Sequence, residues 1–443
     1  MDISFLLNNI LKHKDSEAII TENRVYLFSD IYAEYQETKE LLQKKGMSNG
    51  SIVSLIADFN PKSIAMIMAL IENDSILVPI ALTIKTIDSY IRISQSEFIV
   101  DLRKDELEIT KTNTQVNHEK LLGLKGKDPG LILFSSGTTG EPKAALHNLT
   151  FLLERFKKPG KVLKTVTFLL FDHIGGFNTL LHTLANGGVI VLINSRDPDV
   201  VCRAIELHKV ELLPTSPTFL NLLLLNKMYE KYDLACLKLI TYGTEPMPQA
   251  TLDFLHGIFP DTKLKQTYGL SEVGIISTKS ESSDSLWIKI GGEGVETKIV
   301  DDILFIRTQQ AMLGYLNAPS PFDDDGWFNT NDKVEIKENG YMKILGRITD
   351  IINVGGEKVY PIEVEGILLQ CDGVKDVRVY GESNSLMGKI VVAEISVAPE
   401  NNNKEFVKQL RNYCMYKMEK FKMPVKYNLV DHDLYSDRLK KRR

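Results

Sequence analysis

The sequence predicts an α/β protein with a large N-terminal domain of parallel αβ-layered sheets, a β-rich subdomain and a small α+β domain at the C-terminus. Three observations support this fold class. The 443 residues exceed what one hydrophobic core usually organises. Up to about residue 240, short apolar runs alternate with segments of helical spacing, which is typical of parallel sheets covered on both faces. After about residue 285, short β segments with Gly and Asp turns replace this alternation.

In the first half of the chain, strands and helices follow one another at short intervals. Segment 51–57 predicts a buried strand, 61–73 a buried helix that begins at Pro61, and 76–81 the next strand. The alternation continues with predicted strands at 187–193 and 210–216 and predicted helices at 199–209 and 217–231. We therefore expect parallel strands whose carboxyl ends share an edge.

The second half predicts a different architecture. Segments 286–308 and 326–347 read as antiparallel strands, and the ENG sequence at 338–340 is a good hairpin turn. A compact pattern follows, with strands at 351–354, 374–381 and 389–398 and helices at 361–370 and 404–421. This pattern predicts a small α+β unit, with a domain boundary near 347–350.

Composition argues against several classes of protein. No apolar run is long enough to span a bilayer, and the N-terminus lacks the basic start of a signal peptide. The four cysteines lie far apart without metal-ligand spacing, which is typical of reduced thiols in a cytosol. A net charge of −5 argues against general nucleic-acid binding. We therefore expect a cytoplasmic protein with no membrane insertion and no nucleic-acid partner.

The most informative stretch is FSSGTTGEPKAAL, residues 134–146. Apolar residues run into it and out of it, so a loop is expected to leave one buried strand and enter another. Backbone N–H groups of such a Gly-rich turn, helped by Ser and Thr hydroxyls, form a cradle for an anion. Lys143 adds a point charge suited to phosphate. The loop is not a Walker A motif, because no Gly-Lys-Ser/Thr follows at the required spacing; taken alone, it could also be an ordinary turn.

The string SSGTTGEPK resembles the phosphate loop of the adenylate-forming superfamily. That superfamily includes acyl-CoA synthetases, luciferases and the adenylation domains of nonribosomal peptide synthetases. Three further segments resemble its motifs in the same order: 265–274 the adenine- and magnesium-binding segment, 326–347 the ribose-binding segment, and 355–365 the start of the mobile C-terminal domain. The chain is therefore identified as a member of this superfamily, closest to a small stand-alone AMP-dependent acid ligase.

The resemblance implies a reaction in two halves. A carboxylate attacks the α-phosphate of ATP, which gives an acyl-adenylate and pyrophosphate, and a thiol then displaces AMP. The implied cofactors are ATP and Mg²⁺, with CoA or a carrier-protein phosphopantetheine as the acyl acceptor. Because an anion attacks a polyanion, the site must neutralise charge on the α-phosphate and on the departing pyrophosphate.

The resemblance also implies the nucleotide-binding residues. The β- and γ-phosphates would be held by Ser135, Ser136, Gly137, Thr138, Thr139, Gly140 and Lys143. The backbone that lines the adenine would be that of Gly243, Thr244 and Glu245. Thr267 resembles the position that hydrogen-bonds the α-phosphate, and Glu272 the position that ligates Mg²⁺. Tyr268 is expected to stack on adenine, with a half-buried core aromatic as the alternative.

The ribose-binding segment leads into the expected hinge. Asp332 resembles the acid that takes both ribose hydroxyls, since a carboxylate accepts two hydrogen bonds, and Arg347 would approach the ribose or a phosphate. Domain 1–347 would bind ATP and the acid, and the mobile domain 350–443 would rotate about a hinge near 348–350. Thr349 falls at the hinge position of the family, with Asp350 the alternative because a threonine departs from the usual residue.

The end of the chain departs from the family pattern. Members normally carry a Gly-Lys there, whose lysine bridges the carboxylate and the α-phosphate, but segment 423–443 has none. Laid without gaps, Arg438 takes the lysine position, and Lys440 or Lys441 could serve only with another register. Three readings stay open: Arg438 serves, another lysine serves, or adenylation is weak and the protein mainly binds a nucleotide or acyl-adenylate.

Segment 171–188 resembles the helix that borders the acid pocket. Acyl-CoA-forming members often have a His at the position of His173, next to the reacting carboxylate, whereas amino-acid-activating members use a nearby Asp, as Asp172 could be, for an α-amino group. We favour His173 as the group that orients the carboxylate, with helix capping the alternative for either residue. The expected pocket residues are Asp172, His173, Gly175, Ser216 and Gly269.

The acceptor of the acyl group stays open between CoA and a carrier protein. The basic end of the chain could meet an acidic acyl carrier protein, and the short region 82–130 favours a stand-alone carrier-loading ligase over a fatty acyl-CoA synthetase. In either case the other partner is a small carboxylic acid.

Overall fold

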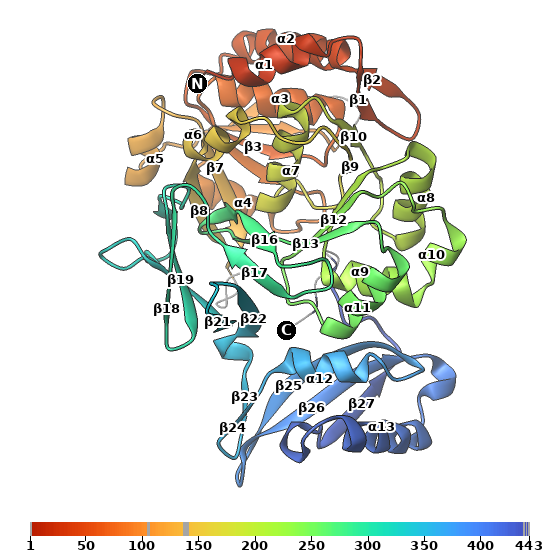
Figure 1. Cartoon of the computed structure of the whole chain (residues 1–443). Helices are drawn as coiled ribbons and strands as arrows, with labels where there is room; N and C mark the ends of the chain where they lie inside the picture. Colours follow the sequence, from red (N-terminus) through yellow and green to blue (C-terminus); the bar gives the residue numbers. More distant parts are fainter. Residues whose placement is uncertain (1, 104–106, 136–140, 437–438, 440, 442–443) are drawn as a thin grey trace.

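The structure is a computed structural model that describes residues 2–103, 107–135, 141–436, 439 and 441. Figure 1 shows a large N-terminal part, coloured red to green, above a separate C-terminal domain, coloured blue. The predicted fold class is confirmed: the chain is a mixed α/β protein with parallel sheets, a β-rich region and a separate α+β domain. Among the described residues, no helix combines the length and apolar character needed to cross a membrane.

The first sheet has the strand order β20-β8-β7-β4-β3-β5-β6. Its strands are β3 (Ile52–Ile56), β4 (Ile76–Ile80), β5 (Phe98–Asp101), β6 (Glu108–Lys111), β7 (Gly130–Ser135), β8 (Lys143–Asn148) and β20 (Gly314–Tyr315). The central strands β5, β3, β4 and β7 run parallel, and every residue of β3 and β4 is buried, as their continuous apolar runs predict. Strands β7 and β8, which precede and follow the SGTTGEP sequence, are largely buried and pair antiparallel.

The second sheet has the order β13-β12-β11-β9-β10-β1-β2 and is parallel except for the edge strand β2. Its strands are β1 (Glu17–Ile20), β2 (Val25–Leu27), β9 (Lys164–Val166), β10 (Val189–Val191), β11 (Leu212–Thr215), β12 (Leu239–Tyr242) and β13 (Lys263–Gln266). Strand β1, from the start of the chain, pairs with β10, so the N-terminus completes a sheet whose other parallel strands come from 164–266.

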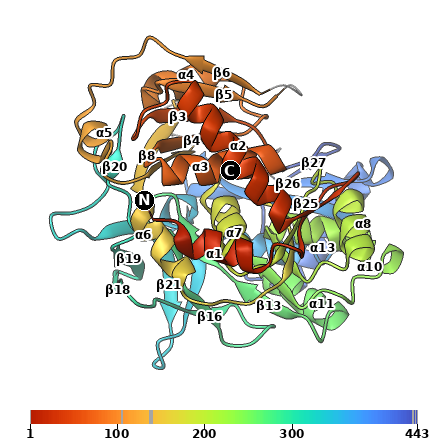
Figure 2. The same cartoon turned by 90° about the horizontal axis from the view of Figure 1, so that it is seen from above.

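Helices cover both sheets (Figures 1 and 2). They are α1 (Ser4–Lys12), α2 (Phe28–Lys44), α3 (Pro61–Glu72), α4 (Ile87–Ser94), α5 (Glu119–Leu124), α6 (Leu149–Glu154), α7 (Ile174–Ala185), α8 (Pro198–His208), α9 (Pro217–Leu225), α10 (Met228–Lys231) and α11 (Gln249–Ile258). Helix α3 begins as predicted, with Asn60 and Ser63 bonding each other's backbone N–H and Pro61 in the first turn. The single helix predicted over 217–231 is wrong, because Lys227 adopts a left-handed conformation that separates α9 from α10.

The β-rich region contains an antiparallel sheet of order β16-β17-β22-β21-β19-β18 and a two-stranded sheet β14-β15. The strands are β14 (Tyr268–Leu270), β15 (Gly274–Ile276), β16 (Thr278–Ser280), β17 (Trp287–Ile290), β18 (Val295–Val300), β19 (Ile303–Thr308), β21 (Phe328–Ile336) and β22 (Met342–Arg347). Asp301 and Asp302 both have positive φ, which is the conformation of the tight turn that joins β18 to β19.

The C-terminal domain packs two helices with one sheet. Its elements are β23 (Ile352–Val354), β24 (Glu357–Val359), α12 (Pro361–Leu368), β25 (Val374–Asn384), β26 (Gly388–Val397), α13 (Lys404–Lys417) and β27 (Lys426–Val430). The predicted strands and helices of this domain are confirmed, except that the helix predicted over 404–421 ends at Lys417, where the backbone of Met418 becomes extended. A 3₁₀ turn, Ile348–Asp350, connects its first strand to β22 of the β-rich region.

Candidate active site

The carboxyl edge of the second sheet brings together residues that are far apart in the sequence. The segments that follow its parallel strands there are Phe168–His173 after β9, Asn194–Arg196 after β10, Ser216 after β11, Gly243–Glu245 after β12 and Thr267 after β13. Ligands of open parallel sheets bind outside this edge, so the sheet supplies a candidate site.

The expected ribose-binding residues form one connected group. The Tyr268 hydroxyl donates to Asp332 Oδ2 at 2.5 Å, and Arg347 Nε lies 3.5 Å from Asp332 Oδ1. Both Tyr268 and Asp332 are 7% exposed, whereas the Arg347 side chain is 51% exposed. Burial raises the pKa of the Asp332 carboxyl, an effect that the Tyr268 hydrogen bond and the Arg347 charge oppose. Burial and the nearby Asp332 raise the pKa of Tyr268, so its hydroxyl stays a donor.

Tyr268 also belongs to a hydrophobic cluster of the β-rich region, so its ring is a buried aromatic with a polar end. This matches the alternative that the sequence left open, and stacking of the ring on adenine stays a prediction. Gly269, expected in the acid pocket, lies against β15: a Cβ there would lie 2.7 Å from Ile275 Cδ1 and 2.8 Å from the Gly274 oxygen. Glycine is therefore required at 269 for packing, whatever else it contacts.

A second group joins the phosphate-loop strand to the expected magnesium ligand. The Tyr315 hydroxyl donates to Glu272 Oε1 at 2.5 Å, and Lys143 Nζ lies 5.4 Å from the centre of the Tyr315 ring. Ser135 ends β7 opposite Lys143 in the strand pair. The other expected phosphate-loop residues, Ser136, Gly137, Thr138, Thr139 and Gly140, lie outside the described residues.

The expected adenine-lining segment contacts Thr267 directly. Thr267 Oγ1 donates to the Tyr242 carbonyl at 3.1 Å, and a Cβ on Gly243 would lie 2.4 Å from the same Oγ1. Thr244 has φ +73°, which is strained for a β-branched residue, and such strain is common at ligand-binding segments. The Glu245 carboxylate faces α9 and the end of the chain, where it accepts from the backbone N–H groups of Thr218 (2.8 Å) and Lys441 (3.1 Å).

A small cavity lies at the start of α7, where the sequence predicts the acid pocket. Its walls are Phe168, Leu169, Leu170, His173, Arg196, Ser216 and Thr244. His173, rather than Asp172, is the N-cap of α7: its Nδ1 accepts from the Gly175 backbone N–H at 3.1 Å. A side chain at Gly175 would crowd this cap, since its Cβ would lie 3.1 Å from His173 Nδ1. Asp172 is buried beside this cap.

Ser216 connects the pocket to the end of the chain. Its hydroxyl accepts from the Phe219 N–H at the start of α9 and donates to the Leu439 carbonyl at 2.8 Å. Leu439 is 8% exposed and belongs to the hydrophobic cluster under the second sheet. Leu439 therefore lies against Ser216 in the wall of this cavity.

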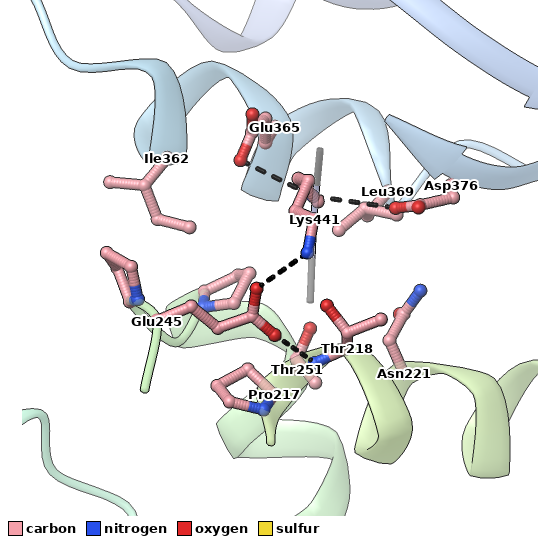
Figure 3. A pocket seen from close by; sticks show the side chains of 12 residues that line it. Pro217, Thr218, Asn221, Glu245, Thr251, Ile362, Glu365, Leu369, Asp376 and Lys441 are labelled. Atoms are coloured by element: carbon pink, nitrogen blue, oxygen red, sulfur yellow. Dashed lines mark hydrogen bonds and ion pairs between the residues drawn. The ribbon is translucent and has the colours of Figure 1, made fainter. Parts of the chain in front are cut away.

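Lys441 lies in a small pocket between the two domains (Figure 3). Its Nζ is 3.4 Å from Glu365 Oε2 and 3.5 Å from Asp376 Oδ1, two carboxylates of the C-terminal domain that are 0% and 7% exposed. Burial raises the pKa of Asp376, which the Lys441 charge opposes. Arg438, the residue expected to replace the family lysine, lies outside the described residues, as does Lys440.

The expected hinge residues lie at the junction of the domains, where Thr349 is exposed and Asp350 is half-buried. Thr349 Oγ1 lies 3.2 Å from Asp350 Oδ1 within the 3₁₀ turn between β22 and β23. The turn lies between strands of two different sheets, which fits a hinge; its role stays a prediction.

Sequence reasoning missed two residues that the structure brings to the site. Arg196 follows the buried strand β10, so a cation at the carboxyl edge of a predicted parallel strand was the available signal. His147, on β8, is fully buried, and its Nε2 donates to the Ser271 carbonyl at 2.6 Å, beside Glu272. Burial lowers the pKa of His147 to about 4. No sequence pattern announces this contact, because 124 residues separate its partners.

The described part of the chain contains no group of three or more His, Cys, Asp and Glu side chains that could hold a metal ion alone. Mg²⁺ does not need one, because it commonly binds through one or two carboxylates together with substrate phosphates and water. A single carboxylate such as Glu272, near Lys143, therefore fits a metal ion that arrives with the nucleotide.

Comparison with known protein families matches almost the whole chain. Residues 7–316 match the family described as AMP-binding enzyme, and residues 363–441 match the one described as AMP-binding enzyme C-terminal domain. The sequence is 24% identical to a 2-succinylbenzoate–CoA ligase of Listeria innocua over 94% of this chain and 92% of that protein. It is 27% identical to 3-[(3aS,4S,7aS)-7a-methyl-1,5-dioxo-octahydro-1H-inden-4-yl]propanoyl:CoA ligase of Rhodococcus jostii over 68% of this chain. The chain spans 55% to 63% of the length of the first three curated relatives it matches.

Solved structures share the fold. An anthranilate CoA ligase in complex with anthranoyl-AMP superposes with a TM-score of 0.82 at 21% identity, covering 99% of this chain and 95% of that one. The o-succinylbenzoate CoA synthetase of Bacillus subtilis, in complex with its acyl-adenylate intermediate, gives a TM-score of 0.76 at 19% identity and covers 99% and 96% of the two chains. At such identities the likeness establishes the fold.

Proposed function

Because this chain belongs to the AMP-binding enzyme family, we propose that it is an AMP-forming acid–thiol ligase. In the first half-reaction, a carboxylate oxygen of a small acid attacks the α-phosphorus of ATP, and the bond to the bridging oxygen of pyrophosphate breaks. In the second, the thiolate sulfur of CoA attacks the acyl carbon, and the bond to AMP breaks. CoA is the favoured acceptor because the relatives are CoA ligases by name, whereas nothing beyond the basic end of the chain supports a carrier protein.

One observation carries the proposal: side-chain contacts connect the separated motifs through the segment 267–272. Tyr268 joins the adenine segment to Asp332, Tyr315 joins Glu272 to the phosphate-loop strand near Lys143, and Gly243 lies against Thr267. A protein that only bound AMP would have no use for Glu272 and Lys143 on the pyrophosphate side, so the binding-only alternative is not favoured.

Each residue has a role in this scheme. Asp332, oriented by Tyr268, accepts the two ribose hydroxyls, and Arg347 adds charge at the ribose or α-phosphate. The Thr267 hydroxyl would turn from the Tyr242 carbonyl to donate to the α-phosphate, and Lys143 with residues 135–140 would hold the outer phosphates. Glu272 holds Mg²⁺, which would neutralise charge on the phosphates. His173, fixed by its contact with the Gly175 N–H, orients the reacting carboxylate.

The decisive assay is acid-dependent exchange of labelled pyrophosphate into ATP, with pools of aryl, short-chain, amino and hydroxy acids. We expect one pool to support exchange, and Glu272→Gln to reduce the rate about 10²- to 10³-fold, because a donor of charge stabilisation is lost. CoA thioester formation, followed by mass spectrometry, then distinguishes CoA from a phosphopantetheinyl carrier. Nucleotide binding without exchange in any pool would instead support the binding-only alternative.

A comparison of Arg438 and Lys441 variants tests which residue replaces the family lysine. We propose that Arg438 bridges the carboxylate and the α-phosphate, since the described position of Lys441 commits its ammonium group to Glu365 and Asp376. Arg438→Ala should then lose exchange yet still form the thioester from a chemically made acyl-adenylate. If Lys441→Ala rather than Arg438→Ala abolishes exchange, the domains must rearrange to bring Lys441 to the phosphate.

A further inference from the structure

The acid cavity contains a cation that the adenylation scheme does not use. Arg196 lines the cavity together with His173 and Ser216, and its side chain is 16% exposed. It follows β10, the strand beside β9, so the fold delivers its guanidinium to the same edge as His173. Burying a charged group is costly unless its donors find partners.

The described partners of Arg196 use only part of its donor set. Its Nε donates to the Phe168 carbonyl at 2.7 Å, and its Nη2 lies 3.5 Å from Asp58 Oδ2. No residue in the described part of the chain makes a hydrogen bond to its Nη1. Asp58 offsets the charge incompletely, because its side chain is 34% exposed and its other oxygen accepts from the Phe59 N–H.

We propose that Arg196 binds a second carboxylate of the substrate, so that the acid is a small dicarboxylic acid. This inference rests on the proposed function, in which the first carboxylate of the bound acid attacks the α-phosphate of ATP. A planar guanidinium with unused donors suits a carboxylate, which it holds through paired, charge-assisted hydrogen bonds. The apolar walls Phe168, Leu169 and Leu170 exclude water and strengthen such a pair.

A purely structural role for Arg196 predicts different results from a role in substrate binding. Asp58 follows β3 of the first sheet, so the Asp58–Arg196 ion pair connects the two sheets. A purely structural Arg196 would affect all acids alike. If Arg196 binds the second carboxylate, its substitution slows the reaction of dicarboxylic acids much more than that of acids with a neutral group at that position.

The experiment compares matched substrates with matched variants. Dicarboxylic acids of three to eight carbons and their half-amides, each of which keeps one reactive carboxylate, are tested by pyrophosphate exchange with wild type, Arg196→Gln and Arg196→Lys. We expect wild type to prefer one diacid over its half-amide on the order of 10²-fold in kcat/KM. Arg196→Gln should reduce this ratio to near one, and Arg196→Lys should keep part of the preference.

Calorimetric binding of the same pair to both proteins gives a readout that does not depend on turnover, with the same discrimination expected only in wild type. Exchange with half-amides or other monocarboxylic acids but with no diacid would overturn the inference and leave the proposed function intact. Equal losses for both substrates in Arg196→Gln would also overturn it, in favour of the structural role. If no acid supports exchange and neither ligand binds, the proposed function fails and the inference fails with it.

Discussion

At the scale of single residues, burial of the ionised Asp332 carboxylate lowers the stability of the folded protein. Its carboxyl is buried, and burial raises its pKa above the ordinary value of 3.8, so the folded protein binds the proton more tightly than the unfolded chain does. The stability that this proton contributes is present at low pH and is lost as pH rises through the raised pKa. Ionised Asp332 at neutral pH therefore costs stability, which is expected of a group kept for binding.

We predict that Asp332→Asn weakens ATP binding on the order of 10²-fold, because an amide loses the charge that strengthens both ribose hydrogen bonds. The variant should gain stability relative to wild type as pH rises from about 4, since it lacks the buried charge. Isothermal titration with ATP and urea unfolding between pH 4 and 8 measure both effects, with the exposed Asp324→Asn as the control. A variant that binds ATP normally would remove Asp332 from the ribose site.

Gly243 is the second residue with a specific expectation. A Cβ at this position would lie 2.4 Å from Thr267 Oγ1 and 2.8 Å from its carbonyl oxygen, so Gly243→Ala must push β12 and β13 apart at their carboxyl ends. We expect a loss of about 1–3 kcal/mol in unfolding free energy and a matching loss of nucleotide affinity.

Gly257→Ala in α11 is the matched control for Gly243→Ala, because its Cβ would meet no atom within 4 Å. That change should be neutral or stabilising by about 0.5–1 kcal/mol, since Ala is a better helix former than Gly. If the two alanine variants have the same thermal unfolding midpoint, the tight contact between residue 243 and Thr267 does not affect stability.

At the scale of elements, His147 connects β8 to the segment before Glu272. Burial depresses its pKa from 6.5 to about 4, so the unfolded chain takes up the proton first. The stability from neutral His147 is therefore present above pH 6.5 and lost as pH falls toward 4, by on the order of 3 kcal/mol.

We predict that His147→Asn flattens the fall in stability between pH 6.5 and 4, because asparagine has no proton to bind in that range. Chemical unfolding at several pH values measures this change, and the exposed His432→Asn should keep the wild-type slope. An unchanged slope in His147→Asn would assign the acid sensitivity to other groups. The same variant is expected to lower the exchange rate, since the Ser271 carbonyl loses the donor that fixes the turn before Glu272.

The sequence predicts individual helices and strands better than it predicts the contacts between them. Buried strands such as β3 and β4 and the capped helix α3 follow from local patterns, and the motifs indicate which residues share a site. The break between α9 and α10 was missed because Lys227 carries no sign of its left-handed backbone. Arg196, His147 and the pairing of Lys441 depend on which loops the sheets bring together, and a single sequence does not contain that information.

At the scale of the whole molecule, Lys441 connects the end of the chain to both domains. Its backbone donates to Glu245 of the large domain, and its side chain pairs with Glu365 and Asp376 of the small one. Because the Lys441 ammonium group pairs with two buried carboxylates, the packing of the small domain against the large one depends on this lysine.

We predict that Lys441→Gln destabilises the C-terminal domain by about 3–5 kcal/mol, because it removes the ammonium group that pairs with two buried carboxylates. Hydrogen exchange of α12 and β25 should rise, and protease cleavage near 348–350 should accelerate as the domains separate. Adding Glu365→Gln and Asp376→Asn to Lys441→Gln should restore part of the protection, and Lys417→Gln on the exposed face of α13 should change nothing. If hydrogen exchange in Lys441→Gln equals that of wild type, the ion pairs of Lys441 do not hold the two domains together.

The pairing of β1 with β10 has a consequence for synthesis on the ribosome. Residues 17–20 leave the exit tunnel early, yet their parallel partner, residues 189–191, follows only after about 170 more residues. At typical elongation rates the hairpin β1–β2 waits roughly 10–30 s with an apolar edge unpaired. The first sheet takes β3, β4, β5 and β7 from consecutive segments, so it can form during that interval. Helix α3 can then pack against β4 and α2 against α3, and α2 in turn contacts the β1–β2 hairpin and shields it from solvent.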